Sequence, residues 1–481
     1  MSLTAPGYDP APPGGLARPW AWVGLGLAGV LLAVCGVSLD GGGLAERPAP
    51  WWRLACTLPG YAALFLAWWR LGPRWRHPRL TAILWSLPLL FSLPLHSRDA
   101  YAYAAVGWHA ARGVDPYVVP LGQAGPAGAL VGEHWAQTTT VYPALQVDVF
   151  ALASRLAGAD PYWTTVVLRL PSILALVLLA LALPALARRL GVDPRVALWA
   201  GALNPVLLVQ WVGGVHNDAP MVALAVAALL AAAAIGRRGW LGLVAAGVLL
   251  GLAMGFKQSA APFGLGLVAV AWAARRDDAG EGGPRGWPRL ALVAVVPAVA
   301  SVAVFLLTSW RWGLGWRAAT AGSPVEAVSL APLSWVAAGL RAAGLGQANG
   351  LVSAISVALI AAGVAWVWVR LGPRADAVGR PTAFAAAVLA VVCLAGPALQ
   401  VWYLTWLIPL LPLCGLGGRW RGLWRVGIVA LLLLPALQDV LPPPLALLAV
   451  APLAWLLARL ASDPDDDTQR PRFDVAPRTG A

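Results

Sequence analysis

Apolar runs of about 17 to 25 residues recur from one end of the chain to the other, separated mostly by short polar connections. Each run is long enough for a helix to cross the roughly 30 Å of hydrocarbon in a bilayer. We therefore predict an all-α polytopic membrane protein with twelve to fourteen transmembrane helices, near residues 19–39, 50–70, 79–95, 163–187, 194–212, 219–236, 239–256, 258–274, 290–309, 350–369, 382–400, 402–418, 426–440 and 443–459.

The spacing of these runs predicts a single transmembrane domain over residues 1–460. Residues 461–481 are acidic and then rich in proline and arginine, which favours a disordered cytoplasmic tail. The polar stretch 96–162 is among the longest between spans. Within it, Ala102–Arg112 predicts a helix, Asp115-Pro116-Tyr117 a turn, and Tyr142 to Leu156 a second helix. Helices of this kind can lie in the membrane interface.

Composition and charge fix the expected orientation. Hydrophobic residues form 59% of the chain and charged residues 11%, which excludes an ordinary soluble domain. The net charge of +13 could indicate a nucleic-acid partner, but the arginines gather in every second connection, which is the positive-inside pattern. We therefore expect a multi-pass protein of the plasma membrane with both termini cytoplasmic, the 96–162 loop outside, and no nucleic-acid partner. The clusters are Arg70, Arg74, Arg76 and Arg79; Arg188, Arg189 and Arg195; Arg237 and Arg238; Arg275, Arg276, Arg285 and Arg289; Arg370, Arg374 and Arg380; and Arg419, Arg421 and Arg425.

An Arg-Asp pair, Arg98-Asp99, follows the third apolar run. Ionisable groups at bilayer depth are costly, so such a residue is a functional candidate. Asp99 could act as a general base, bind a cation, or pair with an arginine and fix the loop. The other polar residues expected on the same side favour catalysis.

Three further positions carry candidate chemistry. His216-Asn217-Asp218 ends the fifth span and suits hydrogen bonding to hydroxyls or phosphate; alternatively, Asn217 or Asp218 caps the next helix, with Pro220 in its first turn. Lys257, the only lysine, could hold a phosphate or extend to the interface. Arg169, inside the fourth span, is expected to face the bundle and pair with a carboxylate or a lipid phosphate.

The remaining composition narrows the chemistry. Most of the 27 tryptophans are expected to form the aromatic belt at span ends, Trp402 included. The four cysteines lie within apolar spans and have no metal-ligand spacing. The chain has no credible nucleotide-binding motif, so no cofactor is firmly implied. A divalent metal is possible, although no ligand cluster is visible.

Several of these residues together resemble a family. Arg98-Asp99-Ala100-Tyr101-Ala102-Tyr103, Gly107 and Gly113-Val114-Asp115-Pro116-Tyr117 are similar to the first outer loop of GT-C glycosyltransferases, and most like that of the actinobacterial polyprenol-phosphomannose-dependent α-1,6-mannosyltransferases. Gly213–Ala219, Lys257 and Gln400–Trp406 look like further landmarks of that family, in the same order. The chain departs from it at Tyr142-Pro143, where the family often has Tyr-Gly-Pro; this bears on the entry of the second loop helix and on acceptor preference.

The resemblance implies a GT-C-like bundle with a large first loop on the catalytic side. It implies inverting transfer of mannose from polyprenyl-phosphate-mannose to a mannan or lipoglycan acceptor on the outer face, with an α-1,6 linkage. Asp99 would deprotonate the acceptor hydroxyl, and groups such as Lys257, His216 and Arg98 would hold the leaving phosphate. The substrate site would also include Asn217, Asp218, Tyr103, Tyr117, Tyr403 and Gln400. The expected partners are the lipid-linked donor, the glycolipid or mannan acceptor and membrane lipids.

Two alternatives remain at this point. The first is the same enzyme class with another polyprenyl-phosphate sugar, such as glucose or arabinose. The second is a non-enzymatic lipid or glycolipid flippase. A flippase should carry polar groups along a path at mid-bilayer, whereas here they gather at the expected outer ends of the spans.

Overall fold

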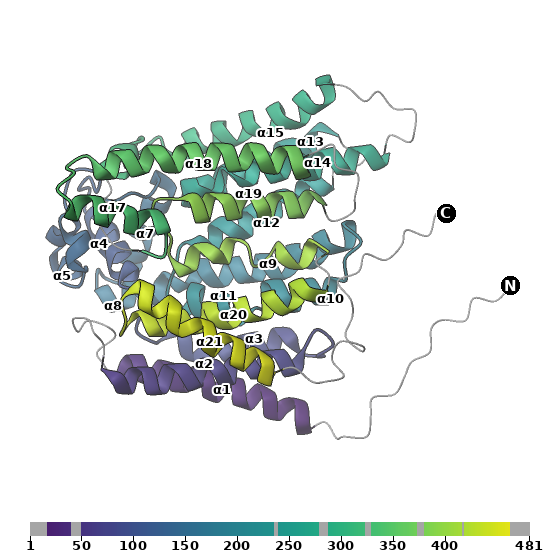
Figure 1. Cartoon of the computed structure of the whole chain (residues 1–481). Coiled ribbons are helices and arrows are strands. Elements are labelled where there is room, and N and C mark those ends of the chain that lie inside the picture. The colour runs from purple at the N-terminus through teal and green to yellow at the C-terminus, as the bar shows by residue number, and fades with distance from the viewer. Residues whose placement is uncertain are drawn as a thin grey trace.

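The computed structural model describes residues 17–39, 50–234, 239–278, 287–322, 329–372, 380–415 and 418–461, and these residues are helical or in turns (Figure 1). The long helices lie side by side, which confirms the predicted all-α, multi-span bundle. They are Ala17–Ser38 (α1), Trp51–Leu71 (α2), Pro78–Leu90 (α3), Arg169–Arg189 (α9), Asp218–Ala233 (α12), Trp240–Phe256 (α13), Phe263–Asp278 (α14), Trp287–Thr308 (α15), Ala348–Leu371 (α18), Arg380–Ala395 (α19), Gly418–Gln438 (α20) and Pro443–Leu460 (α21). The predicted tail beyond residue 461 and Arg237, Arg238, Arg285 and Arg374 lie outside the described residues.

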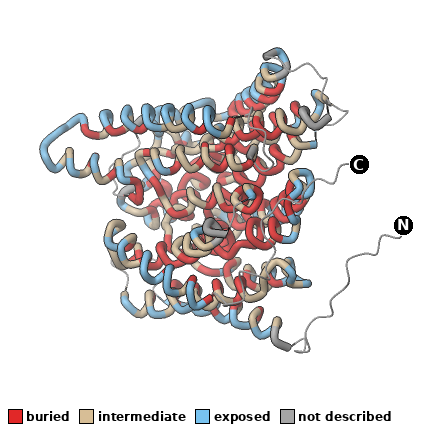
Figure 2. The backbone as a smooth tube through the Cα atoms, turned by 45° about the vertical axis from the view of Figure 1, so that its right-hand side comes forward, coloured by how far each residue is buried: buried red, intermediate tan, exposed pale blue. Residues whose placement is uncertain are grey.

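Within the described residues, six helical segments are long and apolar enough to cross a bilayer, and six shorter apolar helices of 10–17 residues accompany them. Figure 2 shows exposed residues along the outer helices, and many of them are large and apolar. On α18, Val357, Trp366 and Val369 are 68%, 62% and 81% exposed. Large apolar side chains in these positions indicate contact with lipid hydrocarbon. The chain is therefore a multi-pass membrane protein. The long segments are Pro19–Ser38, Pro161–Arg189, Pro194–Gly213, Leu290–Thr308, Ala348–Leu371 and Pro443–Leu460.

Two predicted spans are interrupted. The span near 194–212 consists of Pro194–Ala197 (α10), Leu198–Ala202 (η2), Pro205–Leu207 (α11) and Leu208–Gly213 (η3). Asn204 interrupts it because its side chain accepts a hydrogen bond from the Val206 amide, and Pro205 then restarts the helix. The segment is 94% buried, so its irregular backbone is enclosed by protein. The span near 402–418 consists of short turns, Val401–Trp406 (η6) and Leu411–Leu413 (η7).

The predicted helix–turn–helix of the 96–162 loop is present at one end of the bundle (Figure 1). Its helices are Asp99–Ala111 (α4) and Ala144–Leu156 (α7), and Asp115 closes the turn by accepting a hydrogen bond from the Tyr117 amide at 2.8 Å. The two helices pack closely because Gly107 lies against the Phe150 carbonyl, where a Cβ would approach to 2.3 Å. The remaining short helices of the chain include Leu121–Gln123 (η1), Gly125–Gly128 (α5), Glu133–Ala136 (α6), Pro161–Val167 (α8), Gln258–Ala260 (η5), Trp316–Gly322 (α16) and Pro332–Ala342 (α17). Of these, η1, α5 and α8 contact α4, and α8 also contacts α7.

Arg169 joins the ends of three helical segments. Its guanidinium donates to the carbonyls of Ser92 at 2.7 Å, Val212 at 3.0 Å and Thr165 at 3.3 Å. The prediction of a carboxylate or lipid-phosphate partner is therefore wrong: carbonyls left free at helix ends satisfy this buried cation. Arg169 thereby holds the residues after α3 beside the residues that end η3.

A second buried polar cluster fixes the segment that leads to Asp99. The imidazole of His96 lies 2.6 Å from both the Asp439 carboxylate and the Tyr61 hydroxyl, and Asp439 lies 3.0 Å from the Arg53 guanidinium. His96 has a positive φ of 59°, which non-glycine residues rarely adopt. These contacts, together with a hydrogen bond from the Leu95 amide to the Gly213 carbonyl, hold it in that conformation.

We expect Asp439→Ala to lower the free energy of unfolding by about 3–5 kcal/mol, because it removes the buried carboxylate that Arg53 and His96 share. Asp148→Ala is the matched control: its ion pair with Arg311 has side chains 35% and 42% exposed, so its loss should cost less than about 1 kcal/mol. Chemical unfolding in detergent micelles measures both values. Equal losses in the two variants would show that the buried cluster does not anchor the fold.

Candidate active site

Asp99 is the first residue of α4, at the end of the bundle formed by the 96–162 loop. Its side chain is 17% exposed, and its backbone amide donates to the Ser97 hydroxyl at 3.1 Å. Burial raises the pKa of Asp99 to about 6, against the opposing effect of the Lys257 charge. The carboxylate is thus ionised at neutral pH but holds a proton more strongly than an ordinary aspartate, as a general base requires.

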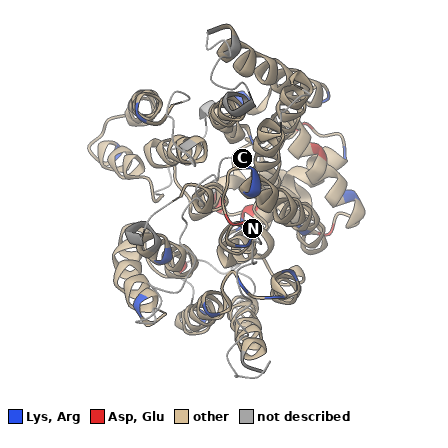
Figure 3. Cartoon of the chain, turned by 90° about the vertical axis from the view of Figure 1, so that its right-hand side faces the viewer, with Lys and Arg blue, Asp and Glu red and all other residues tan. Residues whose placement is uncertain are grey.

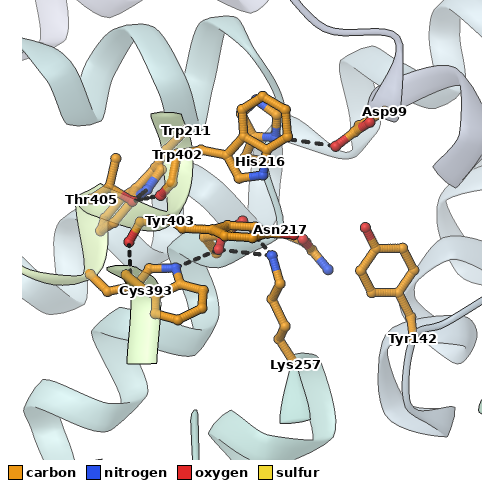
Figure 4. A network of polar contacts seen from close by, with 12 residues as sticks. Asp99, Tyr142, Trp211, His216, Asn217, Lys257, Cys393, Trp402, Tyr403 and Thr405 are labelled. Carbon is orange, nitrogen blue, oxygen red and sulfur yellow. Dashed lines mark hydrogen bonds and ion pairs between the residues drawn. The ribbon is translucent and has the colours of Figure 1, made fainter. Parts of the chain in front are cut away.

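His216 lies next to Asp99, although the two residues come from different parts of the chain (Figure 4). Its Nδ1 is 3.8 Å from the Asp99 carboxylate, and its ring stacks on Trp402 at a centroid distance of 3.9 Å. Burial holds the pKa of His216 well below its usual range, so the imidazole is neutral. Neither ring nitrogen has a hydrogen-bond partner. A neutral imidazole with both nitrogens unpaired can donate one hydrogen bond to a ligand and accept another.

Asp218 and Lys257 form a buried ion pair, and Figure 4 shows Lys257 below His216. The Lys257 ammonium donates to both Asp218 oxygens at 2.9 and 3.0 Å, and its Nζ lies 4.6 Å from the centre of the Tyr403 ring. Trp406 also donates to Asp218, at 2.5 Å. Lys257 is therefore held inside the protein and does not extend to the interface as the alternative prediction supposed. Its charge is balanced by Asp218.

Asn217 occupies the position before α12, but its side chain makes no capping hydrogen bond there. The predicted cap by Asn217 or Asp218 is therefore absent, because both side chains face other residues. The side-chain amide oxygen of Asn217 accepts a hydrogen bond from the Tyr103 hydroxyl at 3.3 Å, and the Tyr142 hydroxyl donates to the Tyr103 hydroxyl at 3.4 Å. The amide nitrogen of Asn217 is buried without a partner.

A small cleft opens beside Asp99. Its lining combines aromatic and apolar side chains with the hydroxyl groups of two tyrosines and two threonines: it consists of Asp99, Ala102, Tyr103, Val106, Leu121, Trp135, Thr139, Thr140, Val141 and Tyr142. Aromatic surfaces with a few hydroxyls and one carboxylate suit a polyhydroxylated ligand.

The structure brings together seven of the ten predicted site residues. They are Asp99, Tyr103, His216, Asn217, Asp218, Lys257 and Tyr403. Arg98 precedes α4, and its side chain lies beside Gly132. The Tyr117 hydroxyl donates to the Tyr142 backbone carbonyl at 2.8 Å and so stabilises the loop instead of facing the other site residues. Gln400 precedes η6, and its side chain makes no cap there.

The sequence analysis assigned Trp402 to the aromatic belt and gave Trp406 no role of its own, but both side chains lie beside the candidate site residues. Trp406 is only 3% exposed and contacts Asp218. In the sequence, the available signal was the four-residue spacing of these two tryptophans, which places them on successive helical turns. In the structure, those turns lie beside the buried ion pair of Asp218 and Lys257. The sequence analysis also did not single out Asp439. An ionisable side chain at the end of a span is energetically costly, and this argument applies to Asp439 as it does to Asp99. Within the described ranges, no three His, Cys, Asp or Glu side chains converge as metal ligands.

Comparison with known proteins gives a consistent result. Residues 23–275 match the model of the "Alpha-(1->6)-mannopyranosyltransferase, N-terminal domain". The chain is 30% identical to alpha-(1->6)-mannopyranosyltransferase A of Mycobacterium tuberculosis, over 83% of this chain and 80% of that protein. It is also 30% identical to a probable alpha-(1->6)-mannopyranosyltransferase of Mycolicibacterium smegmatis, over 74% of this chain and 70% of that protein.

Among solved structures, the chain is similar to the Archaeoglobus fulgidus oligosaccharyltransferase in complex with zinc and sulfate. The match has a TM-score of 0.35 and 14% identity, and it covers 80% of this chain and 52% of that one, so the chain spans about half of that structure. A likeness at this level determines neither fold nor function.

The family model matches more than half of the chain, and the two relatives are similar over most of their length. Both findings agree with a multi-span membrane bundle that holds a buried aspartate beside a cleft with hydroxyl groups. This chain therefore belongs to the α-(1→6)-mannopyranosyltransferase family.

Proposed function

We propose that this mannosyltransferase takes mannose from polyprenyl-phosphate-mannose and transfers it, with inversion, to a mannan or lipoglycan acceptor on the outer side of the plasma membrane. The observation that carries the proposal is the position of Asp99 between a cleft and a set of buried polar atoms without partners. A buried polar group is normally hydrogen-bonded, so such atoms favour a polar ligand in the working enzyme.

Asp99 would be the general base. The acceptor hydroxyl oxygen attacks the anomeric carbon of the donor sugar while Asp99 takes the hydroxyl proton. The bond between that carbon and the phosphate oxygen breaks, and its electron pair leaves with the polyprenyl phosphate. Attack from the face opposite the leaving phosphate inverts the anomeric centre. The phosphate is a stable anion on departure, so the step needs no strong general acid.

His216 and Asn217 would receive the phosphate group of the donor. The unpaired amide of Asn217 and one nitrogen of His216 are hydrogen-bond donors close to the carboxylate. Lys257 would act here mainly through Asp218, because the two charges already balance each other. The ion pair fixes the start of α12 and so orients the two residues immediately before it. The hydroxyl-lined cleft would hold the acceptor sugar.

The surrounding bundle would have a GT-C-like arrangement, with 96–162 as the large first loop on the catalytic side and its helices near the membrane interface. The apolar outward faces of the spanning helices favour contact with the prenyl chain of the donor. Membership of a mannosyltransferase family favours mannose over glucose or arabinose, and catalysis over lipid flipping.

Asp99→Ala and Asp99→Asn should each lower kcat by about 10² to 10⁴, because both remove the proton acceptor. The assay is transfer from radiolabelled polyprenyl-phosphate-mannose to a short α-mannoside by the purified protein in liposomes. Asp148→Asn, on α7 of the same loop, should retain wild-type rates. Near wild-type rates in both Asp99 variants would disprove the assignment of the base.

The pH dependence should follow the pKa of Asp99. Because burial raises that pKa to about 6, the carboxylate is protonated below this value and cannot accept the hydroxyl proton. We expect kcat/KM to be constant above about pH 7 and to fall about tenfold per pH unit below about pH 6. A rate that stays level down to pH 4.5 would be incompatible with Asp99 as the base.

Sidedness can be tested by cysteine labelling in intact cells with a reagent that does not cross membranes. Val118→Cys lies in the loop at a position 71% exposed and should be labelled. Arg188→Cys, exposed at the far end of α9, should be labelled only after the cells are opened. The parent protein, with its four native cysteines, gives the background. The reverse pattern would place the site in the cytoplasm and exclude the proposed location.

A further inference from the structure

A second pocket lies at the end of the bundle away from Asp99. It is formed by the turn between α2 and α3 together with the start of α10, and it has an empty volume of about 1270 Å³. α2 and α3 run along the bundle in opposite directions, so this turn and the 96–162 loop lie at opposite ends (Figure 1). The pocket is therefore separate from the candidate active site.

The charge of this pocket has one sign. Arg74, Arg76, Arg79 and Arg195 line it, and no aspartate or glutamate does. These four arginines form no ion pair within the described part of the chain. Asp193, close in sequence, uses its carboxylate to cap α10. Figure 3 looks onto this end and shows Lys and Arg in blue at several helix ends. Four exposed guanidinium groups around one hollow favour a bound anion.

The backbone adds to this field. α3 has 13 residues, no acidic residue in its first turn and no side-chain cap, and it begins at Pro78 on the pocket wall. The first amides of a helix have no intrahelical acceptor and carry the positive end of the helix dipole. Such a terminus beside several arginines provides both the charge and the directed donors that phosphate groups bind.

The aromatic part of the wall is rigid. Trp75 donates to the Thr81 hydroxyl at 2.8 Å, which fixes its ring over the turn. Trp199 and Trp68 stack at 4.5 Å and exchange hydrogen bonds with each other's carbonyls at 3.1 and 3.2 Å. Because these rings are held in place, the shape of the pocket is largely formed before a ligand arrives.

An apolar surface continues from the pocket along α3. Leu80, Ile83 and Leu87 are 43%, 57% and 49% exposed, and their spacing places them on one face of the helix. Leu80 also lines the pocket itself. If a lipid placed its phosphate in the pocket, its acyl chain could pack against this apolar face of α3. A free phosphate ion has no apolar part and would leave the face uncovered.

We propose that this pocket binds the phosphate headgroup of an anionic membrane phospholipid, with an acyl chain on the α3 face. The arginines hold the phosphate oxygens, and the Arg79 and Leu80 amides in the first turn of α3 donate further hydrogen bonds. The pocket is separate from the candidate active site, with which it shares no lining residue.

The test measures binding of fluorescent phosphatidylglycerol to the purified full-length chain in neutral detergent micelles. We expect Arg76→Gln with Arg79→Gln to raise the Kd at least about tenfold, since each basic group near a lipid surface contributes on the order of a few-fold to tenfold. Arg188→Gln with Arg189→Gln is the matched control, with the same charge change on exposed arginines outside the pocket. The control should bind as the wild type does.

Further arms separate the possible sources of the effect. Fluorescent phosphatidylcholine should bind weakly to every variant, and inorganic phosphate at millimolar concentration should not displace phosphatidylglycerol. If the Kd for phosphatidylglycerol rose equally in the pocket and control variants, the effect would come from the net charge of the protein and not from the pocket. That result would overturn the proposal. Displacement by inorganic phosphate would assign the pocket to a free anion instead. Arg195→Gln, on α10, tests the site from a separate element, and thermal unfolding in neutral micelles verifies that each variant is folded.

Discussion

The structure depends on one constraint: polar groups placed between apolar helices must find their partners inside the protein. Arg169 meets it by binding carbonyls at the ends of three helical segments. His96, Asp439, Arg53 and Tyr61 meet it together. Water is absent from hydrocarbon, so a broken contact in either cluster would leave a group without solvation. These contacts fix the segments that lead into α4 and α12, and those segments carry the candidate active site.

The two carboxylates of the site differ because their surroundings differ. Asp218 is fully buried and saturated by Lys257 and Trp406, so it serves as a fixed counter-ion. Asp99 lies 3.8 Å from the His216 imidazole, beyond hydrogen-bond distance, and borders the cleft, so a substrate can reach its oxygens. Environments that separate two carboxylates in this way commonly separate their roles, one structural and one chemical. His216 and Asn217 lie between them with unpaired nitrogens, which is where a ligand would complete the hydrogen bonding.

The molecule thus presents different chemistry at its two ends. One end has a cleft with hydroxyls, aromatic rings and one available carboxylate. The other has a wide pocket bordered by arginines. The phosphate groups proposed for the two ends would be bound by different means: neutral hydrogen-bond donors beside Asp99 at the first end, and arginines that form no ion pair within the described residues at the second. A phosphate that must leave during a reaction is better bound by a few directed hydrogen-bond donors, because a dense cluster of positive charge would retain it. A lipid that stays bound to the protein is better held by such a cluster.

The sequence alone determined the helical bundle and its approximate spans, because hydrophobic length is a property of short segments, and the cost of buried charge made several ionisable residues candidates for chemistry. It also located Asp99, His216 and Lys257 as candidates. Only the tertiary structure decided how they are used. The pairing of Lys257 with Asp218 joins residues 39 positions apart, and that of Asp439 with His96 joins residues 343 positions apart. No local pattern encodes such partners, because they depend on which helix ends meet. For the same reason, Arg169 was correctly expected to face the bundle, yet its carbonyl partners could not be foreseen.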